Sequence, residues 1–393
     1  MQRKTTVLTG LDHELSEGCP NLTDQRIGMV CNHTAVTAQG EHAVDALLEA
    51  GVHIVRLFGP EHGFRGEVPD GIKIESDRDA LTGLPCTSLY GQRLRPTAEE
   101  LKEIDLLVYD IQDLGVRFYT YIWTLRECMA AAAESGTPFL VLDRPGIVGS
   151  AIEGNVLDER FSSFVGQKPL AWRYAMTPGE LATLYSRQGW LGYSQNMDLK
   201  VVKMLNYQRG IWADETGLPW IAPSPNIPTP TSCIHYPGTC LFEGFSTVTE
   251  GRGTEFPFEI VGAPFVNGED WAKAMEQFDL EGIEFEPAVF TPRSIPKKVD
   301  KPKFMDDKCG GLRLVCSDRS TYSPVRVGIA LIKTLLELYP DQVVFRELHF
   351  DRLSGTDQLR LNLLAGKTLD EIMLSLESSL PGFLPIREAC LLY

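Results

Sequence analysis

Short apolar runs alternate with helical patterns over the first half of the chain. The apolar runs are Ile27–Cys31, Val52–Phe58, Leu106–Ile111 and Phe139–Leu142. Each is rich in Val, Ile, Leu or Phe, as strands covered on both faces of a parallel sheet require. Strands that alternate with helices at this spacing are typical of βαβ units. The pattern therefore predicts an α/β fold with a Rossmann-like N-terminal domain built on a parallel sheet.

Helix signals lie between and after these strands. Glu41–Ala50 precedes Gly51, and Tyr119–Glu134 is closed by Gly136, at the position where helices often end on a left-handed residue. A further helix is expected to begin at Thr177-Pro178-Gly179-Glu180. There Thr serves as the cap, Pro fits the first turn and Glu completes a capping box.

A proline-rich stretch then interrupts the pattern. Pro223-Ser224-Pro225-Asn226-Ile227-Pro228-Thr229-Pro230 can be neither helix nor central strand. We therefore expect residues 1–222 to form a Rossmann-like catalytic domain, and residues 223–393 a smaller α/β or α+β domain that completes a cleft. In the second domain we expect a strand at Gly311–Cys316 and helices near Val325–Tyr339 and Leu369–Leu376.

Composition narrows the class of protein. A length of 393 residues favours two domains or one large α/β unit with an insertion. The net charge of −16 repels phosphate backbones and anionic lipid, so nucleic acid is not an expected partner. The nine cysteines contain no Cys-x-x-Cys pair, which favours reduced thiols. With no signal-peptide pattern and no apolar run of membrane-spanning length, we expect a cytoplasmic protein without membrane insertion; a secreted or periplasmic protein whose N-terminus has been trimmed would show the same pattern.

Polar residues follow all four predicted strands. In an open α/β sheet ligands bind outside the carboxyl ends of the strands, so these residues are expected to converge on one site. The four segments are Asn32-His33, Gly59–Gly66, Asp110–Arg117 and Asp143–Gly146.

Two of these loops carry most of the candidate chemistry. In Gly59–Gly66, three glycines and a proline hold Glu61, His62 and Arg65 on a tight backbone that a ligand can approach closely. The loop after the third strand offers carboxylates beside aromatic rings, an arrangement that suits a sugar. Structural interpretations compete: Glu61 as a helix cap, His62 as a buried structural residue, Asp110 as the partner of Arg117, and Tyr119 and Tyr121 as core.

Cofactor signatures are absent. No G-x-G-x-x-G follows the first strand, and neither a phosphate-binding G-x-x-x-x-G-K-[ST], an H-E-x-x-H nor a G-x-S-x-G motif is present. The seven histidines lack paired spacing, so we expect no metal and no cofactor.

A second polar group lies beyond the predicted boundary. It comprises Tyr236, Glu243, Glu250 and Arg252 in a Gly-rich segment. The sequence Gly251-Arg252-Gly253 would present its guanidinium to a carboxylate, or form a surface turn with an exposed Arg.

Together these motifs resemble the exo-β-N-acetylmuramidase family of the NamZ type. The resemblance covers nearly the whole chain in order and rests on Phe58–Gly66, Asp110–Asp113 with Arg117–Tyr121, Leu142–Pro145, Ser224–Pro228, and Glu250–Thr254 with Pro257–Glu259. It implies a Rossmann-like domain, a smaller α/β domain and a cleft that removes non-reducing-end N-acetylmuramic acid (MurNAc) from peptidoglycan fragments. Two positions depart from the family pattern: Gly146 stands where Asn is frequent, and Tyr174 where His is common.

Glycoside hydrolysis assigns roles to these residues. It needs an acid for the leaving oxygen and a second carboxylate as base or nucleophile. We expect Glu61 to be the acid, with Glu243 or Glu250 as alternatives. Asp113 is the expected second group, and Glu153, Glu243 and Glu250 compete with it. The substrate's own acetamido oxygen is a further option, since it can attack the anomeric carbon.

The lactyl carboxylate of MurNAc should require an arginine, and the Gly-rich loops supply Arg65, Arg117, Arg144 and Arg252. The remaining expected substrate contacts are Asn32, His33, His62, Gln112, Tyr119, Tyr121, Glu153, Tyr236 and Glu250. Two other functions stay open: a metal-assisted amide or ester hydrolase, and a glycan-binding protein without catalysis.

Overall fold

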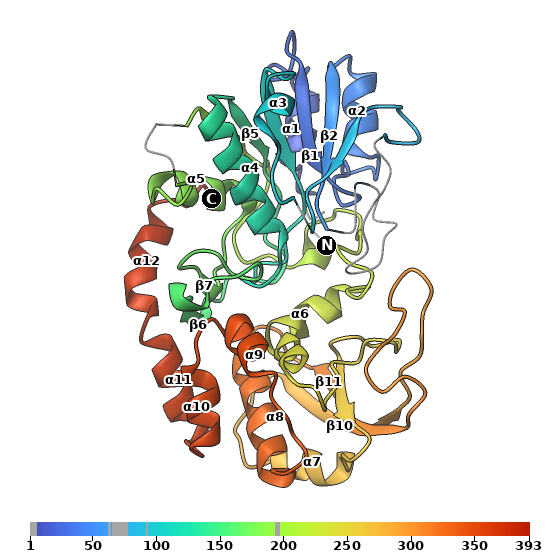
Figure 1. Cartoon of the computed structure of the whole chain (residues 1–393), viewed down its shortest axis with the longest axis vertical. Helices are drawn as coiled ribbons and strands as arrows, with labels where there is room; N and C mark the ends of the chain where they lie inside the picture. Colours follow the sequence, from blue (N-terminus) through green and yellow to red (C-terminus); the bar gives the residue numbers. More distant parts are fainter. Residues whose placement is uncertain (1–5, 62–63, 65–77, 92, 193–196) are drawn as a thin grey trace, which may run out of the picture.

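The structure is a computed structural model that describes residues 6–61, 64, 78–91, 93–192 and 197–393. Figure 1 shows an elongated molecule with the N-terminal domain at one end and the C-terminal domain at the other. Helices α10 to α12 run along one side and return the chain to the N-terminal domain. Among the described residues, no helix is long and apolar enough to cross a membrane.

A parallel sheet organises the N-terminal domain. Within the described residues it has six strands in the order β3-β2-β1-β4-β5-β8, and every neighbouring pair is parallel. The strands are β1 (Ile27–Cys31), β2 (Ile54–Gly59), β3 (Cys86–Ser88), β4 (Leu106–Asp110), β5 (Phe139–Leu142) and β8 (Leu199–Val202). The four predicted strands are confirmed, and the strand order reverses between β1 and β4, where such folds bind ligands.

The helices of this domain follow the predicted signals. They are α1 (Gly10–Ser16), α2 (Ala43–Glu49), α3 (Ala98–Leu101), α4 (Tyr121–Ser135) and α5 (Pro178–Arg187). Gly136 ends α4 in the left-handed conformation, with φ of 68°. At α5, the Thr177 hydroxyl accepts from the Glu180 amide and the Glu180 carboxylate from the Thr177 amide, so the predicted capping box is confirmed. An antiparallel pair, β6 (Glu153–Val156) and β7 (Ala171–Arg173), lies toward the other domain.

The C-terminal domain packs helices on an antiparallel sheet of order β10-β11-β9. Its strands are β9 (Ile260–Ala263), β10 (Ile283–Phe290) and β11 (Cys309–Cys316). The predicted strand and both predicted helices are present, the helices as α8 and α11. The helices are α6 (Pro230–Thr239), α7 (Gly268–Met275), α8 (Pro324–Leu338), α9 (Glu347–Ser354), α10 (Gln358–Leu364), α11 (Leu369–Glu377) and α12 (Leu380–Glu388).

Buried charged residues join the two domains. The Arg117 guanidinium is fully buried and donates to the carbonyls of Asn155 (2.8 Å), Leu170 (3.0 Å) and Ser354 (2.7 Å), the last at the end of α9. Glu153 pairs with Arg173 and accepts from the Ser323 hydroxyl at 2.9 Å. One apolar cluster also contains residues of both domains. The boundary expected at residue 223 stays a prediction.

Candidate active site

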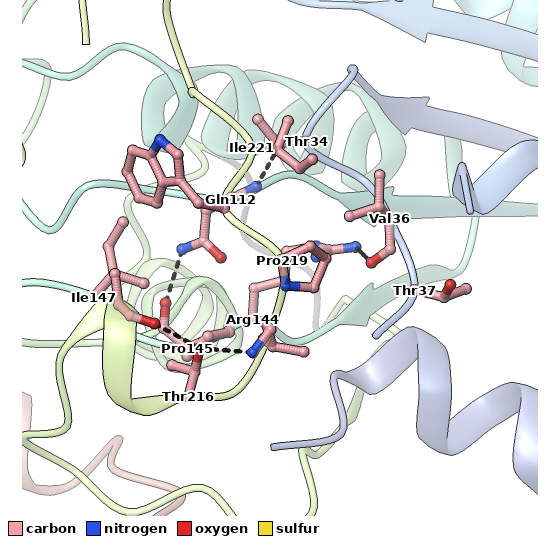
Figure 2. A pocket seen from close by; sticks show the side chains of 13 residues that line it. Thr34, Val36, Thr37, Gln112, Arg144, Pro145, Ile147, Thr216, Pro219 and Ile221 are labelled. Carbon is pink, nitrogen blue, oxygen red and sulfur yellow. Dashed lines mark hydrogen bonds between the residues drawn. The ribbon is translucent and has the colours of Figure 1, made fainter. Parts of the chain in front are cut away.

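The chain itself covers part of the carboxyl edge of the sheet. Residues 204–223 cross this edge: the Ala213 amide donates to the Ile147 carbonyl at 3.2 Å, and His33 Nε2 lies 2.8 Å from the Ala222 carbonyl. The pocket left beneath this segment holds about 40 Å³, room for about three water molecules, and is shown in Figure 2. A sugar ring therefore does not fit there.

Three predicted substrate contacts organise this covered edge. Arg144 is buried and pairs with Asp110, and it also donates to the Val36 carbonyl at 2.9 Å. Gln112 donates to the Pro145 carbonyl at 2.8 Å, as Figure 2 shows. Asn32 accepts from the Thr34 hydroxyl at 2.6 Å and is also buried. Their side chains thus hold the loops after β1, β4 and β5 together.

Glu61 lies at the other side of the strand reversal, after β2. Its Oε2 accepts a hydrogen bond from the Thr120 hydroxyl at 3.0 Å. Thr120 precedes α4 but makes no side-chain cap bond to that helix, because its hydroxyl is directed to Glu61. The residue Glu61 is half-buried. His62 and Arg65 of the same loop lie outside the described residues.

The predicted aromatic cluster links the start of α4 to the proline-rich segment and the C-terminal domain. Tyr119 and Tyr121 each donate a hydroxyl to the Pro223 carbonyl at 2.9 Å. The Tyr119 ring packs edge-on against Tyr236, with centroids 6.0 Å apart, and Tyr236 packs against Phe258 at 4.7 Å. All three tyrosines are buried, so their rings serve the core between the proline-rich segment and the site.

The second polar group forms an ion-pair network. Arg252 pairs with Glu243 and with Glu250 at 3.1 Å, and its guanidinium lies 5.0 Å from the centre of the Phe258 ring. Gly251 and Gly253 on either side have φ of 82° and 83°, a conformation that favours glycine. The alternative of a surface turn with an exposed Arg is wrong, because the Arg252 side chain is only 22% exposed.

Glu250 is held in its ionised form by two cations. Burial by itself would raise the pKa of Glu250, but Lys303 at 3.1 Å and Arg252 lower it to about 2. A carboxylate in this state can bind or orient other groups but cannot deliver a proton near neutral pH.

Asp113 has the opposite environment. It is 4% exposed and accepts from the Tyr174 hydroxyl and from the Gly115 amide at 2.9 Å. Burial raises the pKa of Asp113 to about 6 even though these hydrogen bonds favour the ionised form. Its other oxygen is buried and has no hydrogen-bond partner among the described residues. Tyr174, which departs from the family pattern, thus contacts the predicted second catalytic group directly.

Several expected pairings are corrected by the structure. Asp110 pairs with Arg144, and Arg117 contacts neither Asp110 nor Asp113 through any hydrogen bond or ion pair described for it. Burial lowers the pKa of Arg117 to about 9, and its guanidinium has no exposed surface for a lactyl carboxylate. Glu153 is likewise buried against Arg173. These contacts argue against direct substrate binding by Arg117 and Glu153.

Three residues that the sequence did not single out contribute to the site. Thr120 lies inside a quoted motif, next to Tyr119, so its position was a usable signal. The sequence marks Tyr174 only by its departure from the family pattern, in which His is common at this position. Lys303 is 53 positions from Glu250 along the chain, and no local pattern marks it as a partner.

A continuous set of contacts therefore joins Glu61, through Thr120 and its neighbour Tyr119, to Tyr236, Phe258, Arg252 and Glu243. Among the residues that the structure describes, no group of three side chains is arranged to hold a metal ion. The fold and site define a two-domain α/β protein with carboxylates and an arginine at the domain junction, packed against buried aromatic rings.

Comparison with known proteins gives the family. The family model for the N-terminal domain of the exo-β-N-acetylmuramidase NamZ matches residues 27–231. The model for its C-terminal domain matches residues 234–393. The chain belongs to this family, whose members include glycosidases, and the present chain is an enzyme of that class.

Individual relatives are similar to this chain over nearly its full length. The peptidoglycan β-N-acetylmuramidase NamZ of Bacillus subtilis (strain 168) is 40% identical over 394 residues, which cover 100% of this chain and 92% of the relative. Two DUF1343 family proteins from Bacteroides fragilis NCTC 9343 have crystal structures, and their sequences are 32% and 34% identical to the present chain. Their TM-scores are 0.91 and 0.81, and each comparison covers 99% of both chains.

Proposed function

We propose that this enzyme is an exo-β-N-acetylmuramidase that removes a non-reducing-end MurNAc from peptidoglycan fragments, by hydrolysis of the MurNAc-β-1,4-GlcNAc bond. The observation that carries this proposal is the full-length similarity to a peptidoglycan β-N-acetylmuramidase, at 40% identity. Glu61 and Glu243, which are connected by the contacts described above, are carboxylates of the kind that such a hydrolysis needs.

In this proposal Glu61 is the general acid. The residue is half-buried and lies after β2, and its carboxylate accepts a hydrogen bond from the Thr120 hydroxyl at 3.0 Å. Glu61 gives its proton to the glycosidic oxygen as the bond from that oxygen to the anomeric carbon breaks. Water supplies the hydroxyl group of the released MurNAc and returns a proton to the enzyme.

The second carboxylate is a choice between Asp113 and Glu243. Glu250 and Glu153 are less suited, because both are buried and already paired with cations. Asp113 is close to its protonation midpoint near pH 6, and Glu243 is 23% exposed beside Arg252. Either could act on water or the anomeric carbon, or orient the substrate's acetamido group.

Chemical rescue distinguishes these two residues. Azide should restore activity to the Ala variant of the residue that acts directly at the anomeric carbon. The anomeric configuration of the product then shows whether that residue is a nucleophile or a base. With an activated aryl substrate, rescue of Asp113→Ala and not of Glu243→Ala would assign the role to Asp113. Unimpaired Asp113→Ala activity without azide would make Asp113 a structural partner of Tyr174.

We further propose that Arg252 binds the lactyl carboxylate. Arg117 and Arg144 are buried and bonded within the protein, and Arg65 lies outside the described residues. Arg252 keeps 22% of its side chain exposed and already binds carboxylates. A carboxylate of the substrate would bind in the same manner.

The test of the function compares two chromogenic substrates. The enzyme should hydrolyse an aryl β-N-acetylmuramide and act poorly on the matching β-N-acetylglucosaminide, which lacks the lactyl group. Equal rates on the two would contradict the specificity. Loss of activity with a chelator would favour the metal-assisted hydrolase, and binding without turnover would favour the glycan-binding protein. The expected cytoplasmic location also stays a proposal, which cell fractionation would test.

A further inference from the structure

A second concave surface adjoins the Gly251-Arg252-Gly253 turn. It is an open groove of about 440 Å³, within the range of about 300–1,000 Å³ that is usual for ligand sites. Gly253, Thr254, Phe256, Phe290, Arg293 and Ile295 line it, together with Glu255. Gly253 of this turn lines the groove, so the groove begins beside the backbone of Arg252.

The loop between β10 and β11 gives this groove a positive rim. The loop, residues 291–308, carries six cations against three acidic residues: Arg293, Lys297, Lys298, Lys301, Lys303 and Lys308 against Asp300, Asp306 and Asp307. This concentration of cations is unusual in a chain with a net charge of −16. A local positive field in an acidic protein attracts anionic ligands to one place on its surface.

Most of these cations are available to a ligand. Lys297, Lys298 and Lys301 are exposed, and none of the three forms an ion pair with the part of the chain that the structure describes. Arg293 pairs with Asp306 at 2.9 Å, but both side chains are more than 60% exposed. Such exposed pairs contribute little stability, so Arg293 can exchange its partner for a ligand carboxylate.

The loop is fixed to the candidate site at three points. The Lys298 carbonyl accepts from the Asn226 side chain in the proline-rich segment at 3.3 Å, and Lys303 pairs with Glu250. The Arg293 amide also donates to the Gly253 carbonyl at 2.8 Å. In Figure 1 the loop, drawn in orange, projects from the C-terminal domain toward the N-terminal domain.

We propose that this groove and loop bind the glycan beyond the scissile bond, and that the occupant is an anionic chain carrying at least one further muramic acid. This inference rests on the proposed function. An enzyme that removes the terminal sugar must hold the rest of the chain beside the cleaved bond. Phe290 offers an apolar face for a sugar ring, whereas one face of Phe256 already carries the Arg313 guanidinium, 4.0 Å from the ring centre. Arg293, Lys297 and Lys298 offer charge to the lactyl or peptide carboxylates.

The proposal is tested with two substrates of different length. With the groove beyond the scissile bond, the disaccharide MurNAc-GlcNAc should end before it, whereas the tetrasaccharide (MurNAc-GlcNAc)₂ should bring a second lactyl carboxylate to it. In the double variant Lys297→Gln/Lys298→Gln, the ratio of kcat/KM for tetrasaccharide to that for disaccharide should fall about threefold to tenfold. The variant Lys273→Gln removes an exposed charge from α7, which lies away from the projecting loop in Figure 1, and should keep the wild-type ratio.

A second pair of variants tests the apolar face. Phe290→Ala should lower the same ratio. Val289→Ala should not, because Val289 is 68% exposed and neighbouring strand residues point to opposite faces. An unchanged ratio in both groove variants would overturn the inference, as would equal losses on the two substrates. If the wild-type enzyme cleaved neither substrate, the proposed function itself would be contradicted.

Discussion

The candidate carboxylates differ in what surrounds them. Glu61 is half-buried and receives one hydroxyl hydrogen bond, Asp113 is buried without a cation, and Glu250 is buried between two cations. In a hydrolase, different surroundings give carboxyl groups different pKa values, so that one can act as the acid and another as the base. The identity of these residues alone does not determine these roles.

Substitution of Glu61 tests the acid role. Glu61→Gln should lower kcat on MurNAc-GlcNAc by about 10²- to 10⁴-fold, because the leaving sugar must then depart without a proton. The loss should be much smaller on an aryl substrate whose leaving group needs no proton. Glu99→Gln, at an exposed position of α3, is the control and should behave as wild type. Near-normal disaccharide cleavage by Glu61→Gln would move the acid to Glu243.

The buried carboxyl group of Asp113 should make stability depend on pH. Its pKa is about 6 in the folded protein and about 3.9 when unfolded, so the folded state binds more protons between these values. Its contribution to stability therefore falls as pH rises from about 4 to 6, by about 2–3 kcal/mol in all.

Asp113→Asn should remove this loss. The free energy of unfolding of the variant, relative to wild type, should increase from pH 4.5 to pH 7.5 in urea denaturation. Asp105→Asn is a control of opposite sign, because hydrogen bonds from Arg26 lower the pKa of Asp105 to about 2. That variant should lose stability relative to wild type only as pH rises from about 2 to 4, so from pH 4.5 to 7.5 its difference from wild type should stay constant. A pH-independent difference for Asp113→Asn would contradict the burial argument.

At the scale of elements, turns and caps position the site. The Gly251–Gly253 turn brings Arg252 to Glu243, and Thr120 before α4 is directed to Glu61. Left-handed backbone and close packing both favour glycine in this turn, since a Cβ at Gly253 would lie 2.7 Å from the Arg293 carbonyl oxygen. Small changes here should move functional side chains as well as lower stability.

Gly253→Ala should therefore be strongly destabilising. The left-handed conformation and the clash with Arg293 together should cost about 2–5 kcal/mol of unfolding free energy. Gly366→Ala is the matched control, because Gly366 has a φ of 68° but no atom within 4 Å of the added Cβ. It should lose only about 1–2 kcal/mol. Equal losses for the two variants in urea denaturation would show that packing at Gly253 contributes nothing.

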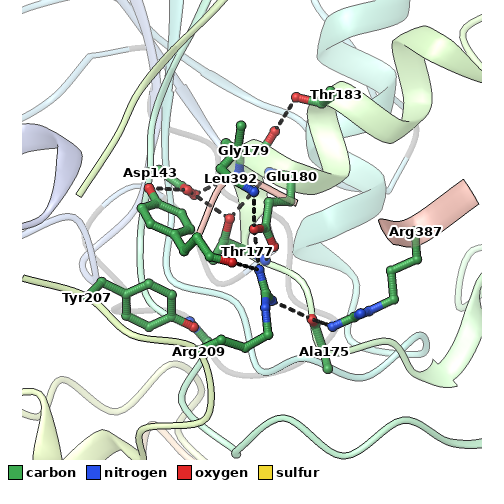
Figure 3. Close-up of polar contacts among 12 residues, drawn as sticks. Asp143, Ala175, Thr177, Gly179, Glu180, Thr183, Tyr207, Arg209, Arg387 and Leu392 are labelled. Carbon is green, nitrogen blue, oxygen red and sulfur yellow. Dashed lines mark hydrogen bonds and ion pairs between the residues drawn. The ribbon is translucent and has the colours of Figure 1, made fainter. Parts of the chain in front are cut away.

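At the scale of the whole molecule, the two domains share buried polar contacts. The C-terminal segment returns to the N-terminal domain, where Arg387 donates to the Ala175 carbonyl at 2.6 Å and the Leu392 amide to Glu180 at 2.7 Å, as in Figure 3. The Tyr393 hydroxyl donates to Asp143 at 2.9 Å. Together with Arg117, these contacts hold the two sides of the candidate site in one arrangement.

Arg117→Met should show how much this arrangement depends on one side chain. The substitution leaves the carbonyls of Asn155, Leu170 and Ser354 buried without their donor, which should cost about 2–5 kcal/mol. Arg95→Met removes an exposed pair with Glu134, both side chains being 44% exposed, and should change stability by less than about 0.5–1 kcal/mol. Thermal unfolding of the two variants side by side gives the comparison. A stability of Arg117→Met equal to that of Arg95→Met would contradict this role of Arg117.

The sequence by itself determined the local parts of the fold. The apolar runs of β1 and β5 predicted those strands with their observed ends, and the capping box at Thr177 and the Gly136 cap were confirmed. These features could be predicted because each depends on residues within a few positions of one another in the sequence. The family motifs likewise placed Glu61 on the loop after β2.

Only the tertiary structure decided which charged groups meet. Asp110 pairs with Arg144, Asp113 with Tyr174, and Arg117 with carbonyls more than 35 positions away, none of which local spacing could reveal. The short strands β3 and β8 gain their stability from neighbours in the sheet rather than from a long apolar run. Burial and ion pairing depend on packing between distant segments, and they determine whether an arginine or a carboxylate faces substrate or the core.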